Sequence, residues 1–309
     1  MKNKQYSRAA AIAASAILTT LASGAAFAGP GGTDWGPASQ LLRTDGTQVP
    51  GGCPIESAGG RFIFTARRPA GPGTQIDIYV NERAAIDAPF ETGSALPEPV
   101  NDPVASDFCP TPLPDGILAF VSTRADTCGG TGESDIAVAV QNPATGWNDP
   151  VYLACDPVGP NTPGTEFSPA LIKNKYGTFL FFSTDYYSGN QDIYYSRMRD
   201  DGTFGPGVAL PWPVNTEYDD RQPNVSQDGK RLVFASNRRT ANSGAPNFDI
   251  MYVKRGSMKA DWGKVVNLSE SVPFDTLDSS ETRPSMSWDG ERLVYGSGGV
   301  WISDSTRKK

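Results

Sequence analysis

Residues 223–234 read PNVSQDGKRLVF, and the pair Asp249-Ile250 follows them along the chain. The stretch joins a proline, a turn built on Asp-Gly, and a run of aliphatic and aromatic residues. The run after the turn has the period of two that is typical of a half-buried strand. Glycine in the turn tolerates the positive φ angle that a tight hairpin needs. The segment therefore predicts two hairpin strands and a third strand that begins at Asp249.

The same phrase occurs five times along the chain, the fifth time in a shortened form that ends in Val300-Trp301. Its prolines are spaced 56, 59, 54 and 61 residues apart and are Pro54, Pro110, Pro169, Pro223 and Pro284. Each unit has room for about four strands, and a repeat of roughly this length is typical of propeller blades. The sequence therefore predicts an all-β fold, a five-bladed β-propeller with four-stranded antiparallel blades.

The outer strand of each blade should follow an aromatic residue and contain valine or leucine. This mark is clear after Trp147, Phe204 and Trp262, and weak around Ile86 to Phe90 in the first unit. The fifth unit lacks it, but residues 35–42, WGPASQLL, carry it ahead of the first unit. We therefore expect an amino-terminal outer strand to complete the last blade, which closes the ring and removes exposed strand edges.

The first 28 residues have the pattern of a secretory signal peptide. Three basic residues precede an alanine-rich apolar stretch that ends in Ala26-Phe27-Ala28, a small-x-small cleavage pattern. We expect residues 29–309 to form one propeller domain, periplasmic or secreted, with no later membrane span. Loss of the three basic residues takes the net charge from −7 to −10, which disfavours nucleic acid as a partner.

The chain has four cysteines and no histidine. An even number of cysteines in an exported protein indicates disulfides, and their spacing fits no zinc site. Cys128 lies in a loop of the second blade and Cys155 ends the outer strand of that blade, whereas Cys53 and Cys109 begin equivalent strands of adjacent blades. We therefore predict the pairs Cys128–Cys155 and Cys53–Cys109, because pairing Cys109 with Cys128 would leave two cysteines too far apart to bridge.

The phrase Pro-x-x-Ser-x-Asp-Gly-x-x-Leu-Val-Phe, as in residues 223–234, resembles the WD40-like PD40 repeat of TolB-like propellers. The resemblance covers nearly all of the mature chain and implies a scaffold or interaction module. Neither the second domain of TolB nor a peptidoglycan anchor is expected here. The related propeller of the prolyl oligopeptidases is excluded, because the chain has no Gly-x-Ser-x-Gly and no histidine base.

Acidic residues stand three positions before the repeat proline in four units, where the first unit has Gly51. They are Asp107, Glu166, Asp220 and Glu281. Because the inner strand lines the channel of a propeller, we expect them near one channel rim. Such acids could hydrolyse glycosides as a pair about 5–10 Å apart, bind Ca²⁺, or cap loop amides and pair with Arg221 and Arg283. Their repetition with the fold favours the structural role, and no catalytic residue or cofactor is assigned.

Two other repeated sets are candidates for contacts. The aspartates that begin the third strands could form bidentate pairs with the arginines after the second strands; they are Asp77, Asp135, Asp192 and Asp249, with Arg68, Arg124 and Arg238. Aromatic residues of the third unit could include a sugar-stacking platform, although their alternation favours blade core; they are Phe179, Phe181, Phe182, Tyr186, Tyr187, Tyr194 and Tyr195.

Binding without chemistry is the function that these features favour, with an envelope protein or a glycan as the partner. The alternative is a carboxylate-dependent glycan hydrolase or lyase on the same scaffold. An enzyme should bring two or three acids together in one pocket with unequal environments, whereas a scaffold should show a symmetric ring.

Overall fold

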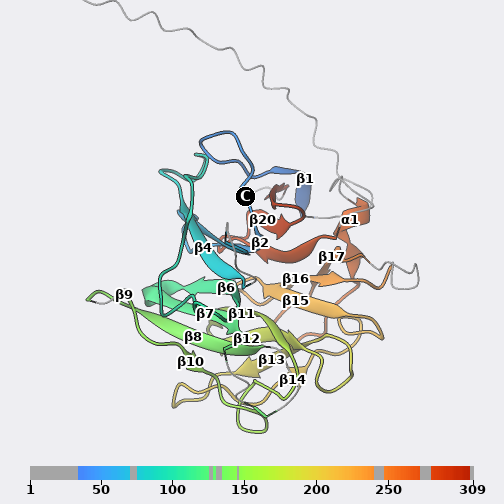
Figure 1. Ribbon diagram of the computed structural model, residues 1–309. Coiled ribbons are helices and arrows are strands. Elements are labelled where there is room, and N and C mark those ends of the chain that lie inside the picture. The colour runs from blue at the N-terminus through green and yellow to red at the C-terminus, as the bar shows by residue number, and fades with distance from the viewer. Residues whose placement is uncertain are drawn as a thin grey trace, which may run out of the picture.

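The computed structural model describes residues 34–69, 75–124, 128–129, 134–144, 146–239, 247–271 and 280–306. The predicted signal peptide lies outside the described residues. The described strands form five antiparallel sheets, of which four have four strands and one has a short additional strand at its side. Figure 1 shows these sheets arranged around a common centre. The predicted five-bladed β-propeller with four-stranded blades is confirmed.

The blades follow one another along the chain, and each begins with its inner strand. The first blade contains β2 (Gly52–Glu56), β3 (Phe62–Arg67), β4 (Asp77–Glu82) and β5 (Ser94–Ala95). The second contains β6 (Asp107–Leu113), β7 (Ile117–Ser122), β8 (Asp135–Asn142) and β10 (Val151–Tyr152), with the short β9 (Gly146–Trp147) beside β8 and the 3-10 turn η1 (Pro114–Gly116) between β6 and β7. The third contains β11 (Glu166–Asn174), β12 (Gly177–Thr184), β13 (Asp192–Arg197) and β14 (Val208–Ala209). The fourth contains β15 (Asp220–Val225), β16 (Arg231–Ser236), β17 (Asp249–Lys254) and β18 (Val266–Asn267), followed by the short helix α1 (Leu268–Ser271).

The fifth blade joins the two ends of the chain. It contains β19 (Thr282–Met286), β20 (Arg292–Gly296), β21 (Val300–Ser305) and, as its outer strand, β1 (Trp35–Gln40). Figure 1 shows the blue β1 beside the red carboxy-terminal strands. The inner strands β2, β6, β11, β15 and β19 each contact the next, and β19 contacts β2. The predicted closure of the ring by an amino-terminal outer strand is therefore confirmed.

A β-bulge recurs in all five inner strands, at the residue before the repeat proline. The residues there have φ between 46° and 57° and are Cys53, Cys109, Ser168, Gln222 and Arg283. The strand pairing shifts register at the same place in each blade. Proline suits the next position because it has no backbone N–H. At a bulge the hydrogen-bond ladder is interrupted, so the missing N–H removes no ladder hydrogen bond. The repeat proline thus marks a bend at the innermost strand.

The core is divided among the interfaces between neighbouring blades. Each of the five hydrophobic clusters combines buried side chains from two adjacent blades. The cluster of the fourth and fifth blades includes Trp35, which is 2% exposed, so the amino-terminal strand is part of the core. Burial of these apolar surfaces is the main term that holds the blades together.

One predicted strand was misplaced. The outer strand of the first blade was expected around Ile86 to Phe90, but it is formed by Ser94 and Ala95. Phe90 is fully buried and makes an isolated bridge with Arg43. In the first blade, as in the second, third and fourth, the outer strand begins four residues after the aromatic residue. The strand itself was missed because serine and alanine carry no strand preference.

Both predicted disulfides are present. Cys53–Cys109 joins the inner strands of the first and second blades with a Cα–Cα distance of 4.8 Å, and Cys128–Cys155 lies within the second blade at 5.6 Å. Disulfides persist in oxidising compartments, so the pattern is that of a protein that folds outside the cytoplasm. No helix in the described part of the chain is long and apolar enough to cross a membrane.

Candidate functional site

Two of the four predicted channel-rim acids form ion pairs inside their own blades. Asp107 accepts a hydrogen bond from Arg124 Nη2 at 2.9 Å and another from the Asp102 amide at 2.7 Å. Asp220 is held in the same way by Arg238 Nη2 at 2.6 Å and by the Thr216 amide at 2.7 Å. Both carboxylates are fully buried. Each acid therefore fastens the loop that joins its blade to the preceding one.

The other two acids use hydroxyl partners. Glu166 Oε1 accepts hydrogen bonds from Thr162 at 2.5 Å and Thr184 at 2.9 Å, and Glu281 Oε2 accepts one from Ser269 at 3.0 Å. Both side chains are 1% exposed or less. Burial raises the pKa of Glu166 to about 9, against the opposing effect of the threonine hydroxyls. Glu166 is therefore a neutral, hydrogen-bonding group at neutral pH.

The expected arginine partners were wrong. Arg221 does not pair with the acids but lies over the Phe248 ring, 3.5 Å from its centroid. Arg124 and Arg238 bind the inner-strand acids, not the third-strand aspartates that were predicted for them. In the fourth blade the aspartate Asp249 does form a bidentate pair, but with Arg239, at 2.5 and 3.0 Å.

The centre of the ring is occupied by side chains from the bulge positions. Arg283 of the fifth blade is fully buried and reaches Pro110 O and Thr111 Oγ1 of the second blade and Pro169 O of the third, at 3.3, 3.0 and 3.3 Å. These blades are not neighbours of the fifth, so the guanidinium crosses the axis. The Cys53–Cys109 disulfide joins two of the other bulge positions. The described part of the channel therefore presents no accessible carboxylate at this level.

A repeated asparagine clamp was missed by the sequence reasoning. Asn101, Asn161 and Asn215 each bond both backbone groups of the isoleucine that follows the third-strand aspartate, at 2.8–3.1 Å. The same amide donates to the carbonyl of a leucine just after the outer strand. The signal was available as an Asn five or six residues before three of the repeat acids.

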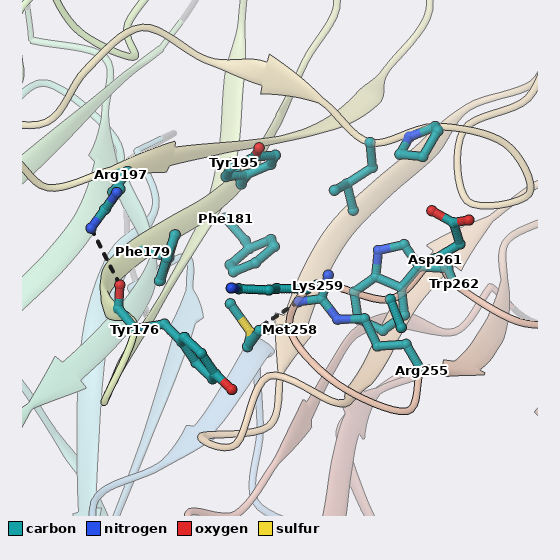
Figure 2. A pocket seen from close by; sticks show the side chains of 13 residues that line it. Tyr176, Phe179, Phe181, Tyr195, Arg197, Arg255, Met258, Lys259, Asp261 and Trp262 are labelled. Atoms are coloured by element: carbon teal, nitrogen blue, oxygen red, sulfur yellow. Dashed lines mark hydrogen bonds between the residues drawn. The ribbon is translucent and has the colours of Figure 1, made fainter.

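A surface cleft of about 460 Å³ opens between the third and fourth blades. One wall comes from the third blade, with Phe179 and Phe181 on β12 and Tyr195 opposite them on β13. The other wall comes from the fourth blade, with Arg255, Met258 and Trp262 between β17 and β18. Figure 2 shows the aromatic rings facing the segment that carries Met258 and Trp262. The cleft thus joins residues about 80 positions apart in the chain.

Three cationic side chains line this cleft. Arg255 donates from Nε to the Gly229 carbonyl at 2.7 Å and stacks on Trp262, with its guanidinium 4.1 Å from the ring centroid. Arg197 and Lys259 are exposed at the rim. Burial lowers the pKa of Arg255, but an arginine stays protonated at physiological pH.

The strand residues of the predicted aromatic platform lie on two opposite faces of the third blade. Phe179, Phe181 and Tyr195 line the cleft. Phe182 and Tyr194 lie on the opposite face of the blade, in the core cluster shared with the second blade. Phe181 is 2% exposed and belongs to the core cluster shared with the fourth blade, and Phe179 and Tyr195 pack against that cluster. The strand alternation that favoured blade core is thus correct for both faces, and the face toward the fourth blade also lines the cleft.

A second cleft of about 320 Å³ lies at the equivalent place between the first and second blades. Strand pairing makes Phe62, Phe64 and Val80 the counterparts of Phe179, Phe181 and Tyr195. Trp147 stands where Trp262 does, four residues before the outer strand. The second cleft offers a natural comparison, because it has the same framework without the three cations.

The described residues show no metal site. No group of three or more acidic, cysteine or histidine side chains is placed to hold a metal ion among them. The four inner-strand acids are each directed at their own joining loop and are not gathered into such a group.

Comparisons with known proteins identify solved structures with a similar fold. No family model matches the chain, and a search of curated proteins found no match. Among solved structures, an α-L-arabinofuranosidase from Podospora anserina in complex with cellotriose is 15% identical, with a TM-score of 0.59 over 89% of this chain and 97% of that one. The arabinanase of Bacillus subtilis is 12% identical, with a TM-score of 0.54 over 88% and 96%.

A chain described as TolB from Agrobacterium tumefaciens is 17% identical, with a TM-score of 0.46 over 81% of this chain and 72% of that one. That score is too low to carry an argument. At these identities the likeness to the two glycoside hydrolases shows the fold alone. The chain therefore shares its fold with the arabinofuranosidase and the arabinanase.

Proposed function

We propose that this protein is an exported, non-catalytic propeller that binds a glycan in the cleft between its third and fourth blades. The observation that carries the proposal is the aromatic wall at an open cleft of about 460 Å³, in which Phe179 and Tyr195 are half-buried and Phe181 is 2% exposed. The buried inner-strand acids, by contrast, are used to hold loops.

The cleft has the composition of a saccharide site. Sugar rings stack on aromatic faces through their apolar C–H surfaces, and a ligand pocket in proteins typically measures about 300–1,000 Å³. Tyr176, which is 37% exposed, extends the aromatic surface at the end of the wall. The rim adds charged donors that can bind sugar oxygens. These features favour a glycan over an extended protein partner, because the cleft is short and open.

Glycan hydrolysis is the second candidate. The names of the matched arabinofuranosidase and arabinanase indicate that activity for those proteins. The observation that favours it is the pKa of about 9 for Glu166, because a protonated carboxyl is what a general acid requires. Against it, Glu166 is 0% exposed and bonded to two threonines, and a glycosidase must bring two carboxylates to one bond.

The proposal also includes the repeat type of the propeller and its export from the cytoplasm. The PD40 phrase and the leader pattern in residues 1–28 support a TolB-like repeat module exported to the periplasm or beyond. The two disulfides agree with an oxidising compartment. In this proposal, residues 29–309 form a single propeller domain after the leader is removed.

The proposal is tested with residues 29–309 on a glycan array, followed by titration calorimetry with the glycans that bind. We expect Phe179→Ala to weaken binding at least tenfold, and Phe62→Ala, its counterpart in the second cleft, to leave binding unchanged. Product analysis of the same glycans tests hydrolysis. Release of shorter saccharides by the wild type but not by Glu166→Gln would favour the enzyme instead.

A further inference from the structure

The cleft between the third and fourth blades is a positive site on an acidic protein. The chain has 27 basic and 34 acidic residues and a net charge of −7. Three of the cations, Arg197, Arg255 and Lys259, line this one cleft, where Asp261 is the sole carboxylate among the lining residues described. A local excess of positive charge on such a background requires its own explanation.

Among the residues that the structure describes, no carboxylate forms an ion pair with these three cations. Within the described chain, none of them lies within 4.0 Å of an acidic oxygen, and Asp261 is not paired with any of them. Arg255 is held by the Gly229 carbonyl and by Met258 Sδ at 3.0 Å, so its position is fixed without its charge being compensated. An unpaired, partly desolvated guanidinium attracts an anion more strongly than a hydrated one does.

The first blade has an arginine with a structural role, Arg83, at the position equivalent to Arg255. Arg83 stands six residues after the third-strand aspartate, as Arg255 does, and it also bonds a turn glycine carbonyl and stacks on an aromatic ring. Arg83, however, is 3% exposed and ion-paired to Glu56 at 2.6 Å. Arg255 makes the equivalent glycine and aromatic contacts, but no acid in the described part of the chain pairs with it.

The fold does not demand positive charge at these positions. In the second cleft, Gln141 occupies the place of Arg255, and Glu82 of the first blade occupies the place of Arg197 in the strand register. Both clefts nevertheless keep the tryptophan and the phenylalanine wall. The cations are therefore particular to one of two clefts that share a framework.

We infer that the ligand of the cleft is an anionic saccharide, one whose sugar ring packs on the aromatic wall while its carboxylate or sulfate is bound by Arg255, with Arg197 and Lys259 at the rim. This inference rests on the proposed glycan-binding function and names its ligand class. Figure 2 shows Arg255 beside Trp262 on the wall opposite Phe179 and Phe181, with Lys259 in the cleft. A planar guanidinium can donate two parallel hydrogen bonds to either group.

The test is titration calorimetry of residues 29–309 with trigalacturonate, its fully methyl-esterified form and a sulfated galactose trisaccharide. Esterification removes the charge and keeps the sugar rings. We expect the acid or the sulfated sugar to bind at least tenfold more tightly than the ester, and which of the two binds identifies the anionic group. Binding of the charged sugar should weaken from 50 to 500 mM NaCl, and binding of the ester should not.

Arg255→Gln gives the cleft the residue found in its counterpart. This variant should lose about tenfold in affinity for the charged sugar, the effect of one charge-assisted hydrogen bond, and nothing for the ester. Lys264→Gln removes the same charge from an exposed residue that does not line the cleft, and it should bind like the wild type.

Two outcomes contradict the inference in distinguishable ways. Equal binding of acid and ester, with Arg255→Gln unchanged and Phe179→Ala impaired, leaves the glycan proposal standing and overturns the anionic ligand. Absence of binding to all three sugars and to every glycan on the array overturns the proposed function, and this inference falls with it.

Discussion

Arg283 Nη2 lies 3.0 Å from Thr111 Oγ1, although the two residues belong to the fifth and the second blade. The guanidinium reaches the second and third blades across the axis and is fully buried, without a carboxylate partner among the described residues. Burial lowers the pKa of Arg283 to about 9. The ring is thus held at its centre by hydrogen bonds from a cation whose desolvation is costly.

Two substitutions of Arg283 distinguish the stabilisation that its hydrogen bonds provide from the free-energy cost of burying its charge. Arg283→Ala leaves a cavity and removes the guanidinium donor from three acceptors, of which Pro169 O keeps a hydrogen bond from Thr111 Oγ1. We therefore expect a loss of about 2–4 kcal/mol in the free energy of unfolding. Arg283→Met fills most of the volume and removes the buried charge, so the loss should be smaller by about 1 kcal/mol or more. Urea denaturation of both variants measures the difference. Equal losses would show that the charge carries no net cost.

Ring closure by β1 should dominate the stability of the fifth blade. Deleting residues 29–41 removes the partner strand of β21 and the buried Trp35. We expect the free energy of unfolding to fall by at least about 4 kcal/mol, the cost of losing a large core side chain together with an edge strand. A truncation after Thr306 is the control. Equal melting temperatures for the two truncations would contradict a closing role for β1.

The architecture was predictable from the sequence because it repeats. A proline just after the bulge of each inner strand and a glycine turn recur at a nearly constant period, with a strand-leading aspartate in four of the five units, and this repetition predicted the blade number. The positions of Cys53 and Cys109 in equivalent strands then sufficed to pair them. The displaced strand at Ser94 shows the limit, because two small residues leave no pattern to read.

The site was less predictable, since it depends on which of several candidate side chains meet. Asp220 could have paired with the adjacent Arg221, but successive residues of a strand face opposite sides, and Arg238, two residues after β16, lies on the correct side. The cleft combines Phe179 of one blade with Trp262 of the next. Only the packing of neighbouring blades brings such residues together, so periodicity within one unit could not reveal it.

Gly229 should be required for the shape of the cleft. Its φ is +70°, and a Cβ there would lie 1.8 Å from Met258 Sδ. Gly229→Ala must therefore shift Met258 and disturb Arg255, which is bonded to the Gly229 carbonyl. Gly202→Ala is the control, because Gly202 has φ +84° and open space around it.

We expect Gly202→Ala to cost about 1–2 kcal/mol from the left-handed backbone alone. Gly229→Ala should cost more in urea denaturation and should also weaken glycan binding in calorimetry. The same stability loss in both variants, with binding unchanged, would show that the segment carrying Met258 adapts without affecting the cleft.

Glu166 should make the stability of the protein depend on pH. Its pKa is raised from 4.5 to about 9 by burial. Between these values the folded state holds one proton more than the unfolded state, so the free energy of unfolding should fall as the pH rises from about 5 to 8. The absence of histidine leaves few other groups that titrate in this range. The neutral, isosteric Glu166→Gln variant should therefore show a flatter pH profile in urea denaturation, and parallel profiles for the two proteins would mean that Glu166 is ionised in the folded state.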